Sequence, residues 1–572
     1  MALDMIASIK FLQYLHKLLD GERETILRYP YTPQKPRPHI SGLGERLERC
    51  SLREAGVSAV QLEGFFKKLC GRYGVGAHNI LLCRHGKVFC KAGWAPYSPD
   101  VWHVTHSLCK SVTGTAIGLL IGEGRLTLND KAGDLLDGKM PFLASTNIRS
   151  VTVRDLLMMS SGVQFKETGS ILEPLWSKAF FRAPQEFEPG TRFDYNSMNS
   201  YLLACIVQKV TGMGLMDYLN VHLFQPMGIR DAAWEKSPEN IEKGGWGMYL
   251  LPEDVAKLGL LYLQKGKWHG KQLLPQVWTE EATTTQITGQ DNDRLIEYGY
   301  HIWTRQSDGM FQFNGMFGQY MVAYPKWDMI AVMNSGNAHL DTHAFALDCM
   351  DEFFAGGKIF QRENAMRETA AAHRLGRTLQ HLKFEEPYAF RTGPADKELA
   401  LFAQGLLHKT YVFSKNTTGL LPLVLQCMNG NFSRGLQELT LHDGWLEWKE
   451  SDETYRLPFA AGEIKKCTLS FHGEEYLTAV TTEFLRDENR ELYLKLRLCL
   501  LETSSSRWIK IYQKPDGLWM ICGEEPGFAA IVNMVLPPQN SQEAYAEAKD
   551  MGYAKYKLRQ LFQPTLYGKE KT

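Results

Sequence analysis

The sequence predicts an α/β (α+β) fold with a mostly antiparallel sheet flanked by helices, a helical subdomain, and a separate C-terminal all-β domain. Within residues 51–360, segments that alternate like strands stand at both ends and enclose segments with helical spacing. Beyond residue 387, alternating segments and Asp-Gly turns recur, as they do in all-β domains. The length of 572 residues also exceeds what one core usually supports, so two domains are expected.

Residues 1–50 are predicted to form an amphipathic helix followed by a proline-rich arm. Residues 78–96 alternate like two strands joined at His85-Gly86, which predicts a hairpin at the start of the sheet. The segment from about Ser107 to Gly122 is apolar around much of its circumference, as a central helix would be. The other patterned segments of residues 51–360 are helices at 151–163, 201–212, 253–268 and 341–357 and strands at 298–306, 310–315, 319–325 and 329–336.

Residues 361–386 are charged and helix-forming and are interpreted as a linker. Residues 387–538 are predicted to form a small sandwich or barrel, and residues 539–572 a helical tail. Four tryptophans on the predicted strands alternate with charged residues, which favours a one-sided sheet core over a binding face. They are Trp445, Trp448, Trp508 and Trp519.

The composition argues against several classes of partner. Lys plus Arg and Asp plus Glu both number 64, and no long run of one sign suggests nucleic acid or an anionic membrane. Eleven cysteines without a Cys-x-x-Cys pair indicate reduced core residues. Histidine and cysteine spacings support no metal site, and no phosphate-binding glycine loop predicts a nucleotide cofactor, so none is expected. The absence of a signal-peptide pattern and of a spanning apolar run predicts a cytoplasmic protein without membrane insertion.

Ser107, Lys110 and Tyr195 are the candidate catalytic residues. On a helix, positions three apart share a face, so the amine of Lys110 would lie beside the hydroxyl of Ser107 and could take its proton. A free ammonium titrates near about 10.4, so this requires burial or a neighbouring cation. Tyr195 stands in a turn-rich stretch and would supply a second proton carrier. The plainer interpretation makes Ser107 a helix cap and Lys110 a solvated lysine.

Four motifs in order, VTHSLCKSVTGTAIGLL, VTVRDLLMMSSGV, FEPGTRFDYNS and GMFGQYMVAYPKWDMIAVMNSG, resemble the β-lactamase-type serine hydrolases from about Val57 to Gly357. This family includes class C β-lactamases, penicillin-binding proteins, esterases and nylon-oligomer hydrolases. The resemblance implies a β-lactamase/transpeptidase-like fold. It also implies that Ser107 is acylated, that Lys110 is its partner, and that Tyr195 belongs to the second motif.

Two motif positions depart from the family. Ser197 replaces the usual asparagine of the second motif, and the best match to the third motif, Met316-Phe317-Gly318, lacks the Lys or His. The resemblance then implies an oxyanion site made by the backbone N–H groups of Ser107 and Gln319, with Ser197 and residues 316–318 lining the pocket. A missing cation argues against a penicillin-like anionic substrate.

The sequence therefore predicts a serine hydrolase that cleaves an ester or amide bond of a small-molecule or peptide-like substrate through an acyl-enzyme on Ser107. Two alternatives stay open: a catalytically silent relative that binds a peptide or acyl ligand, and a D-peptide-processing peptidase or transpeptidase. His103, His106 and Cys109 are interpreted as structural, because neighbouring helical positions point away from the 107/110 side. The role of the β-domain, whether in substrate recognition or in homodimer formation, also stays open.

Overall fold

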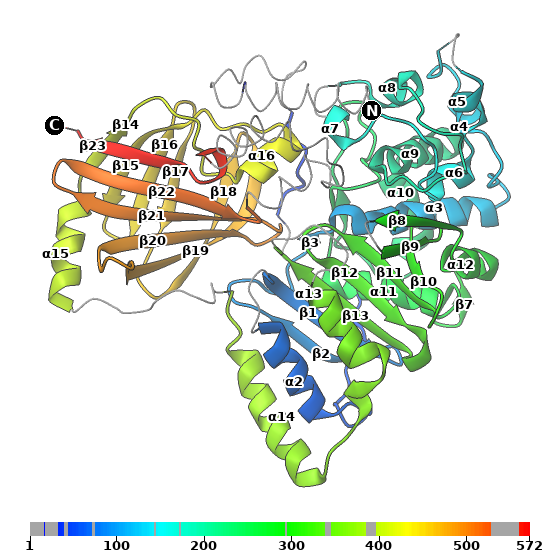
Figure 1. Cartoon of the computed structure of the whole chain (residues 1–572), viewed down its shortest axis with the longest axis horizontal. Helices are drawn as coiled ribbons and strands as arrows, with labels where there is room; N and C mark the ends of the chain where they lie inside the picture. The colour runs from blue at the N-terminus through cyan, green and yellow to red at the C-terminus, as the bar shows by residue number, and fades with distance from the viewer. Residues whose placement is uncertain are drawn as a thin grey trace, which may run out of the picture. The chain divides into compact units, whose positions relative to one another are not determined.

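The computed structural model divides into two compact units, and each is described by itself (Figure 1). The first, here the sheet unit, comprises residues 39–335 and 341–383; the second, the barrel unit, comprises residues 1–38, 336–340 and 384–572. The described residues are 17, 32–38, 44–70, 75–141, 145–170, 173–291, 294–337, 345–384, 396–527 and 560–571. The predicted N-terminal helix lies outside them except for Lys17.

In the described part of the sheet unit, eight strands form one antiparallel sheet in the order β2-β1-β13-β12-β11-β10-β9-β8. The predicted hairpin is confirmed, with its turn at His85-Gly86. The strands are β1 (Ala77–Arg84), β2 (Lys87–Gly93), β8 (Ile287–Asp291), β9 (Arg294–Tyr298), β10 (Trp303–Arg305), β11 (Met310–Gly315), β12 (Gln319–Tyr324) and β13 (Met329–Ser335). Both ends of the domain thus contribute to one sheet, as the pattern predicted.

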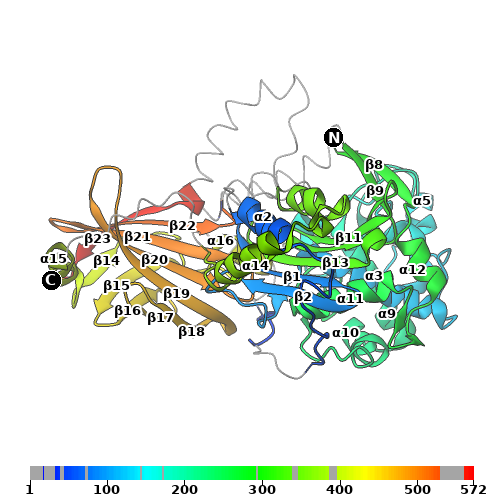
Figure 2. The ribbon, with the colours of Figure 1, turned by 90° about the horizontal axis from the view of Figure 1, so that it is seen from below.

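Helices cover both faces of this sheet (Figures 1 and 2). On one face, Gly259 of α11 (Pro252–Leu263) approaches Met321 and Ile330 so closely that a Cβ on it would lie 2.6 Å from the Met321 sulfur. On the other face, Phe354 of the one-turn π-helix η5 (Asp351–Ala355) packs against Tyr324, with 5.9 Å between the ring centroids. The sheet is therefore buried on both sides, which explains why its central strands read as continuous apolar runs.

The helical insertion between β2 and β8 forms the subdomain that the sequence predicted, although α11, which was expected there, covers a face of the sheet instead. Its other α-helices are α3 (Cys109–Gly122), α4 (Ala132–Leu135), α5 (Thr146–Ser150), α6 (Val153–Leu157), α7 (Glu167–Ser170), α8 (Trp176–Arg182), α9 (Ser197–Thr211), α10 (Leu215–Leu219) and α12 (Gln276–Ala282). Helices α2 (Ala59–Cys70), α13 (Phe345–Met350) and α14 (Ala365–Gln380) lie outside this insertion, and Phe65 of α2 packs against Phe353 and Phe354 of η5. In the described residues no single helix is both long and apolar enough to cross a bilayer; only Ser197–Thr211 with Leu215–Phe224 passes as a pair, bent by 71°.

Helix α14, which the sequence placed in a linker, packs against α2 within the sheet unit (Figures 1 and 2). Arg374 of α14 forms two hydrogen bonds to the Glu63 carboxylate of α2, at 2.8 and 2.7 Å. Glu368 of α14 accepts hydrogen bonds from the hydroxyl of Ser58 and the amide of Ala59, both at 2.7 Å. These contacts make the helix part of the sheet unit.

In the barrel unit, ten described strands form one antiparallel sheet in the order β17-β16-β15-β14-β23-β22-β21-β20-β19-β18, which curls into a nearly closed barrel (Figure 1). The strands are β14 (Thr410–Phe413), β15 (Leu436–His442), β16 (Trp445–Glu450), β17 (Thr454–Pro458), β18 (Ile464–Phe471), β19 (Glu474–Arg486), β20 (Leu492–Leu500), β21 (Ser506–Lys514), β22 (Gly517–Glu525) and β23 (Thr565–Glu570). Helices α15 (Asp396–Leu406) and α16 (Leu423–Asn429) accompany them.

Strand β23 was not indicated by the sequence, which suggested a helical tail. It inserts between β14 and β22, pairing with both in antiparallel register. The helix predicted before it lies outside the described residues except at its end, where residues 560–562 are helical. The proline-rich arm lies against the barrel: the amides of Gln34 and Lys35 donate to the Glu474 carboxylate at 2.9 and 3.1 Å, and the Lys35 amine lies 3.0 Å from Glu502.

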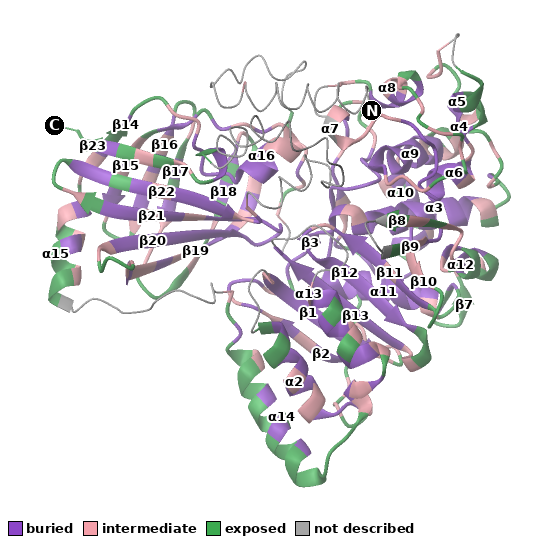
Figure 3. Cartoon of the chain, viewed as in Figure 1, coloured by how far each residue is buried: buried purple, intermediate pink, exposed green. Residues whose placement is uncertain are grey.

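One buried apolar cluster fills the barrel, and Figure 3 shows buried residues along its strands together with partly or fully exposed ones. The expectation that all four tryptophans belong to this core is wrong. Trp448 is fully buried within it, whereas Trp519 is 37 % exposed on the outer face. Trp445 and Trp448 lie three positions apart on β16, and because side chains alternate along a strand they point to opposite faces.

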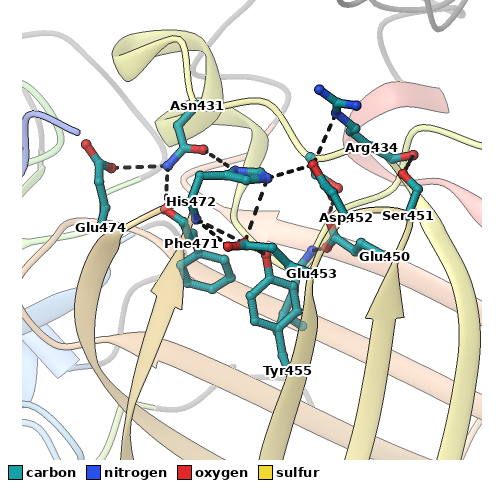
Figure 4. Close-up of polar contacts among 12 residues, drawn as sticks. Asn431, Arg434, Glu450, Ser451, Asp452, Glu453, Tyr455, Phe471, His472 and Glu474 are labelled. Carbon is teal, nitrogen blue, oxygen red and sulfur yellow. Dashed lines mark hydrogen bonds and ion pairs between the residues drawn. The ribbon is translucent and has the colours of Figure 1, made fainter. Parts of the chain in front are cut away.

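Strands β17 and β18 stand at the two ends of the strand order, and side chains join the hairpins at one end of this seam (Figure 4). The His472 ring contacts Asn431 Oδ1 at 2.6 Å and Asp452 Oδ2 at 3.0 Å, and its amide donates to the Glu453 carboxylate. Asn431 also donates to the carbonyl of Phe471 at 3.0 Å. The hairpin β16–β17 is thus tied to the hairpin β18–β19 without a backbone ladder.

Candidate active site

Ser107 stands where a short strand gives way to a central helix. Strand β3 (His103–Val104) leads into the one-turn 3-10 helix η2 (His106–Leu108), and α3 follows directly. The residue before the serine, His106, has a φ of +47°, a strained conformation for a residue with a side chain. Neither Thr105 nor Leu108, the residues that cap η2 and α3, makes a side-chain cap, and Ser107 contacts Lys110 instead. The capping interpretation of Ser107 is therefore not what the structure contains.

Lys110 lies one turn along the same helix, and its side chain is buried. Its Nζ is 2.8 Å from Oγ of Ser107 and 2.8 Å from the carbonyl oxygen of Gly245. The residue is 1 % exposed, so it is not the solvated lysine of the plain interpretation. In the part of the chain that the structure describes, no carboxylate forms an ion pair with it. The distance allows a proton to pass directly between Oγ and Nζ.

Tyr195 faces the same place from the turn before α9. The Lys110 Nζ lies 4.9 Å from the centroid of its ring. The ring also stacks on Trp303 of β10, with centroids 5.8 Å apart and an interplanar angle of 25°. The turn is fixed by Asn196, whose side chain accepts from the Met198 amide at 2.9 Å and donates to the carbonyl of Val163 at 2.8 Å. The three residues singled out in the sequence are thus close together in space.

Ser197 forms part of the surroundings of the lysine. A Cβ on Gly245 would lie 2.9 Å from the Ser197 carbonyl oxygen, 3.1 Å from its Cβ and 3.4 Å from Lys110 Nζ. These three groups therefore converge on one glycine. Only a residue without a side chain fits there, and this lets the Gly245 carbonyl approach the amine.

The third motif is displaced from the position that the sequence suggested. Gly315, at the end of β11, lies directly against residues 105–108, the turn that carries Ser107 and is here called the serine turn. A Cβ on Gly315 would lie 2.3 Å from the Thr105 carbonyl oxygen and 3.1 Å from the Leu108 amide nitrogen. Strand β10 pairs with β11 only at residues 310–312, so the edge of residues 313–315 is not covered by that pairing. The stretch beside Ser107 is therefore Phe313-Asn314-Gly315, and its first residue is apolar.

The predicted third-motif residues follow this stretch. Met316, Phe317 and Gly318 form the turn between β11 and β12, and the Phe317 ring packs edge-on against His106 at 5.4 Å. Gln319 begins β12, an internal strand of the sheet, and pairs with Gly315. Its buried side chain donates to the carbonyl of Ser335 at 2.7 Å and accepts from Asn334 at 2.9 Å.

The neighbouring histidines and Cys109 have structural surroundings. The His103 ring faces His78 at 3.0 Å and the carbonyl of Val104 at 2.9 Å. Burial lowers the pKa of His106 to about 3, and burial raises the pKa of the Cys109 thiol to about 12. Cys109 is therefore a thiol and not a thiolate nucleophile.

His301 is a residue that the sequence did not single out. It is 1 % exposed and adopts a φ of +58°. Its ring contacts Ser200 of α9 at 2.8 Å and the Leu157 carbonyl at 2.9 Å, and its carbonyl accepts from Ser111 of α3 at 2.7 Å. Burial lowers its pKa to about 3, so it is neutral and joins α3 to α9 by hydrogen bonds alone. No local pattern could have indicated it, because its partners lie far away in the sequence.

Part of the chain is similar to known proteins. Residues 62–346 match the family model described as Beta-lactamase. The chain is 24 % identical over 347 residues to a 6-aminohexanoate-dimer hydrolase of Paenarthrobacter ureafaciens, covering 55 % of this chain and 82 % of that protein. It is 27 % identical over 176 residues to protein flp of Staphylococcus aureus, covering 28 % of this chain and 35 % of that one.

Among solved structures, a penicillin-binding protein from Bacillus halodurans is similar with a TM-score of 0.39 and 23 % identity, covering 51 % of this chain and 98 % of that one. Residues 62–346, which match the family model, include Ser107, Lys110 and Tyr195. Through residues 62–346, the chain belongs to the β-lactamase-type serine hydrolase family.

Proposed function

We propose that this protein hydrolyses an ester or amide bond through an acyl-enzyme on Ser107. The observation that carries the proposal is the 2.8 Å contact between the buried Lys110 Nζ and Ser107 Oγ, with Tyr195 beside the same amine. A relative of this chain is named for hydrolysis of the 6-aminohexanoate dimer, which supports an acyl-transfer substrate.

In the acylation step, Oγ of Ser107 attacks the substrate carbonyl while its proton passes to the uncharged amine of Lys110. Collapse of the tetrahedral adduct breaks the bond to the leaving alcohol or amine, which receives a proton from Lys110 by way of Tyr195. Water then attacks the acyl carbon and gives a proton to Lys110 and Tyr195. The bond between the acyl carbon and Oγ of Ser107 breaks, Oγ takes the proton back, and the acid leaves.

The oxyanion of the adduct needs two donors, and we assign them to the backbone N–H groups of Ser107 and Met316. The sequence suggested Gln319 as the second donor. Gln319 lies in the ladder of an internal strand, however, whereas Gly315 touches the serine turn and Met316 leaves the strand beside it. Met316 is therefore better placed.

The pocket suits an uncharged acyl group. The residue at the third-motif position beside the serine turn is the apolar Phe313, whose buried ring packs against Tyr262 of α11 with centroids 5.5 Å apart, and Trp303 and Tyr195 stack near Lys110. A cytoplasmic location and a recognition or dimerisation role for the barrel unit stay predictions.

The test is covalent labelling with a fluorescent fluorophosphonate, together with hydrolysis of p-nitrophenyl butanoate. Ser107→Ala should abolish labelling, and both Ser107→Ala and Lys110→Ala should lower ester turnover on the order of 10³-fold. The exposed residues Ser150 and Lys271 provide matched controls, because their alanine variants should keep wild-type rates. Wild-type protein that neither labels nor turns over ester would support the silent alternative, and undiminished turnover in Ser107→Ala would move the chemistry elsewhere.

A further inference from the structure

The turn that carries Tyr195 is bound along its length by a segment about 30 residues earlier in the chain. The amide of Asp194 donates to the carbonyl of Met159 at 2.8 Å. The Asn196 side chain donates to the carbonyl of Val163 at 2.8 Å. The residues on either side of Tyr195 are therefore both held by this one segment.

Glu167 completes the attachment with its carboxylate. Its Oε1 accepts a hydrogen bond from the amide of Ser197 at 2.9 Å. Ser197 is the first residue of α9, and its amide is one of those that have no partner inside the helix. Glu167 thus caps the start of α9 together with Asn196, whose side chain accepts from the Met198 amide.

The position of Ser197 affects both Tyr195 and the surroundings of Lys110. Tyr195 lies two residues before it, and on the other side its carbonyl and Cβ lie against Gly245, whose own carbonyl accepts from Lys110. A shift of Ser197 would therefore displace the phenol and disturb the support of the amine together. Both groups belong to the proton path.

Two ion pairs near the turn engage other charged residues. The Lys166 amine lies 2.8 Å from the Asp194 carboxylate, and Arg192 bonds Glu186 at 2.6 Å. Among the described residues, no cation forms an ion pair with Glu167; its carboxylate accepts from the Ser197 amide, and its backbone carbonyl accepts from the Ser170 hydroxyl at 2.6 Å. Its part in the site is that of a hydrogen-bond acceptor.

We propose that Glu167 is a positioning residue for Tyr195, acting through the Ser197 amide to set the second motif against Lys110. This inference rests on the proposed acyl-transfer function. Glu167 acts by offering an acceptor oxygen, so its charge and its proton are dispensable, and a glutamine should replace it.

The first test compares Glu167→Ala and Glu167→Gln in hydrolysis of p-nitrophenyl butanoate and in the rate of fluorophosphonate labelling. Glu167→Ala should lower kcat and the labelling rate on the order of 10-fold, with KM within about 3-fold, because misplacing a proton carrier weakens the chemical step. Glu167→Gln should stay within about 3-fold of wild type. Glu188→Ala, which removes an exposed carboxylate from the same region, should change neither rate.

A double-mutant cycle with Tyr195→Phe separates positioning from general stability. If Glu167 acts through Tyr195, Glu167→Ala should cost clearly less once the phenol is gone, since only the effect that reaches Lys110 by way of Gly245 remains, whereas an independent structural role gives additive losses. Should Glu167→Ala fail to fold, Glu167→Gln and the similarly shaped Glu167→Met provide the same comparison.

Three results would overturn the inference: wild-type kcat in Glu167→Ala, a loss in Glu167→Gln equal to that in Glu167→Ala, or additive losses in the cycle. These differ from failure of the proposed function, in which wild-type protein itself would show no labelled Ser107.

Discussion

Lys110 Nζ and Ser107 Oγ lie 2.8 Å apart, and the lysine that makes this contact is 1 % exposed. Lysine is almost never fully buried without a compensating interaction, because removing its amine from water costs several kcal/mol. The Gly245 carbonyl and the Tyr195 ring are its other neighbours. The burial therefore separates this Ser-x-x-Lys sequence from a chance occurrence on a surface helix.

Tyr195→Phe removes the phenolic hydroxyl but keeps the ring that stacks on Trp303. We expect kcat for p-nitrophenyl butanoate to fall on the order of 10²-fold, because the proton carrier to the leaving group is lost. The free energy of unfolding should change by less than about 1 kcal/mol. Tyr567→Phe, at an exposed barrel position, is the control. Unchanged turnover would mean that Lys110 moves the proton without Tyr195.

Gly315→Ala should damage the oxyanion site. The new Cβ would lie 2.3 Å from the Thr105 carbonyl oxygen, so β11 must move away from the serine turn. We expect kcat to fall at least about 10-fold, with a stability loss of about 1–3 kcal/mol from overpacking. Gly356→Ala is the matched control, because a Cβ there meets nothing within 4 Å and its φ is −78°. Wild-type kinetics in Gly315→Ala would remove β11 from the catalytic geometry.

The buried Phe313 predicts a preference against carboxylate-bearing substrates. Benzylpenicillin should acylate Ser107 at least about 10-fold more slowly than p-nitrophenyl butanoate, since an apolar residue at the third-motif position cannot compensate the desolvation of its carboxylate. Its methyl ester should react no more slowly than the acid. Mass spectrometry of the acylated protein measures both rates, and faster reaction of the free acid would place a cation in the pocket.

The contact between Glu63 and Arg374 should make stability depend on pH. The Arg374 hydrogen bonds lower the pKa of Glu63 from 4.5 to about 2. The native carboxylate therefore binds fewer protons than the unfolded one, so the stabilisation is full above about pH 4.5 and is lost as the pH falls towards 2. Because the Arg374 side chain is half exposed and solvent screens the pair, its size is on the order of 1 kcal/mol.

Urea unfolding of wild type and Glu63→Gln at pH 7 and pH 3 measures this effect. The difference in unfolding free energy between the two proteins should shrink at the lower pH. A difference that does not depend on pH would show that the carboxylate contributes through packing instead of charge.

Local patterns in the sequence were sufficient for the elements that form from neighbouring residues. The hairpin at His85-Gly86, the helix that follows Ser107 and the strands at 310–315 and 319–325 have strong periodicity and turn residues. Strand β23 could not be predicted in this way, because its short, polar segment becomes a strand only by pairing with β14 and β22. For α14, the pattern predicted a helix but not its packing on α2.

In the candidate site, too, some residues could be predicted from local patterns and others could not. Ser107, Lys110 and Tyr195 were found from motif order and spacing, and the structure brings them together. Gly245 and His301 were not found, because their contribution depends on contacts between residues more than 100 positions apart. The register of the third motif was ambiguous in the sequence, since two glycines lie within four residues, and the packing of Gly315 against the serine turn became visible only in the structure.

The insertion of β23 between β14 and β22 has a consequence for biosynthesis. During translation the barrel lacks its last neighbour until residues 565–570 have left the ribosome, about 150 residues after β14 has emerged. Until then both β14 and β22 expose an open edge to other nascent chains. The last helix of the sheet unit ends at Gln380, so all strands of that unit are synthesised well before β23. The sheet unit can therefore complete its sheet during translation earlier than the barrel unit.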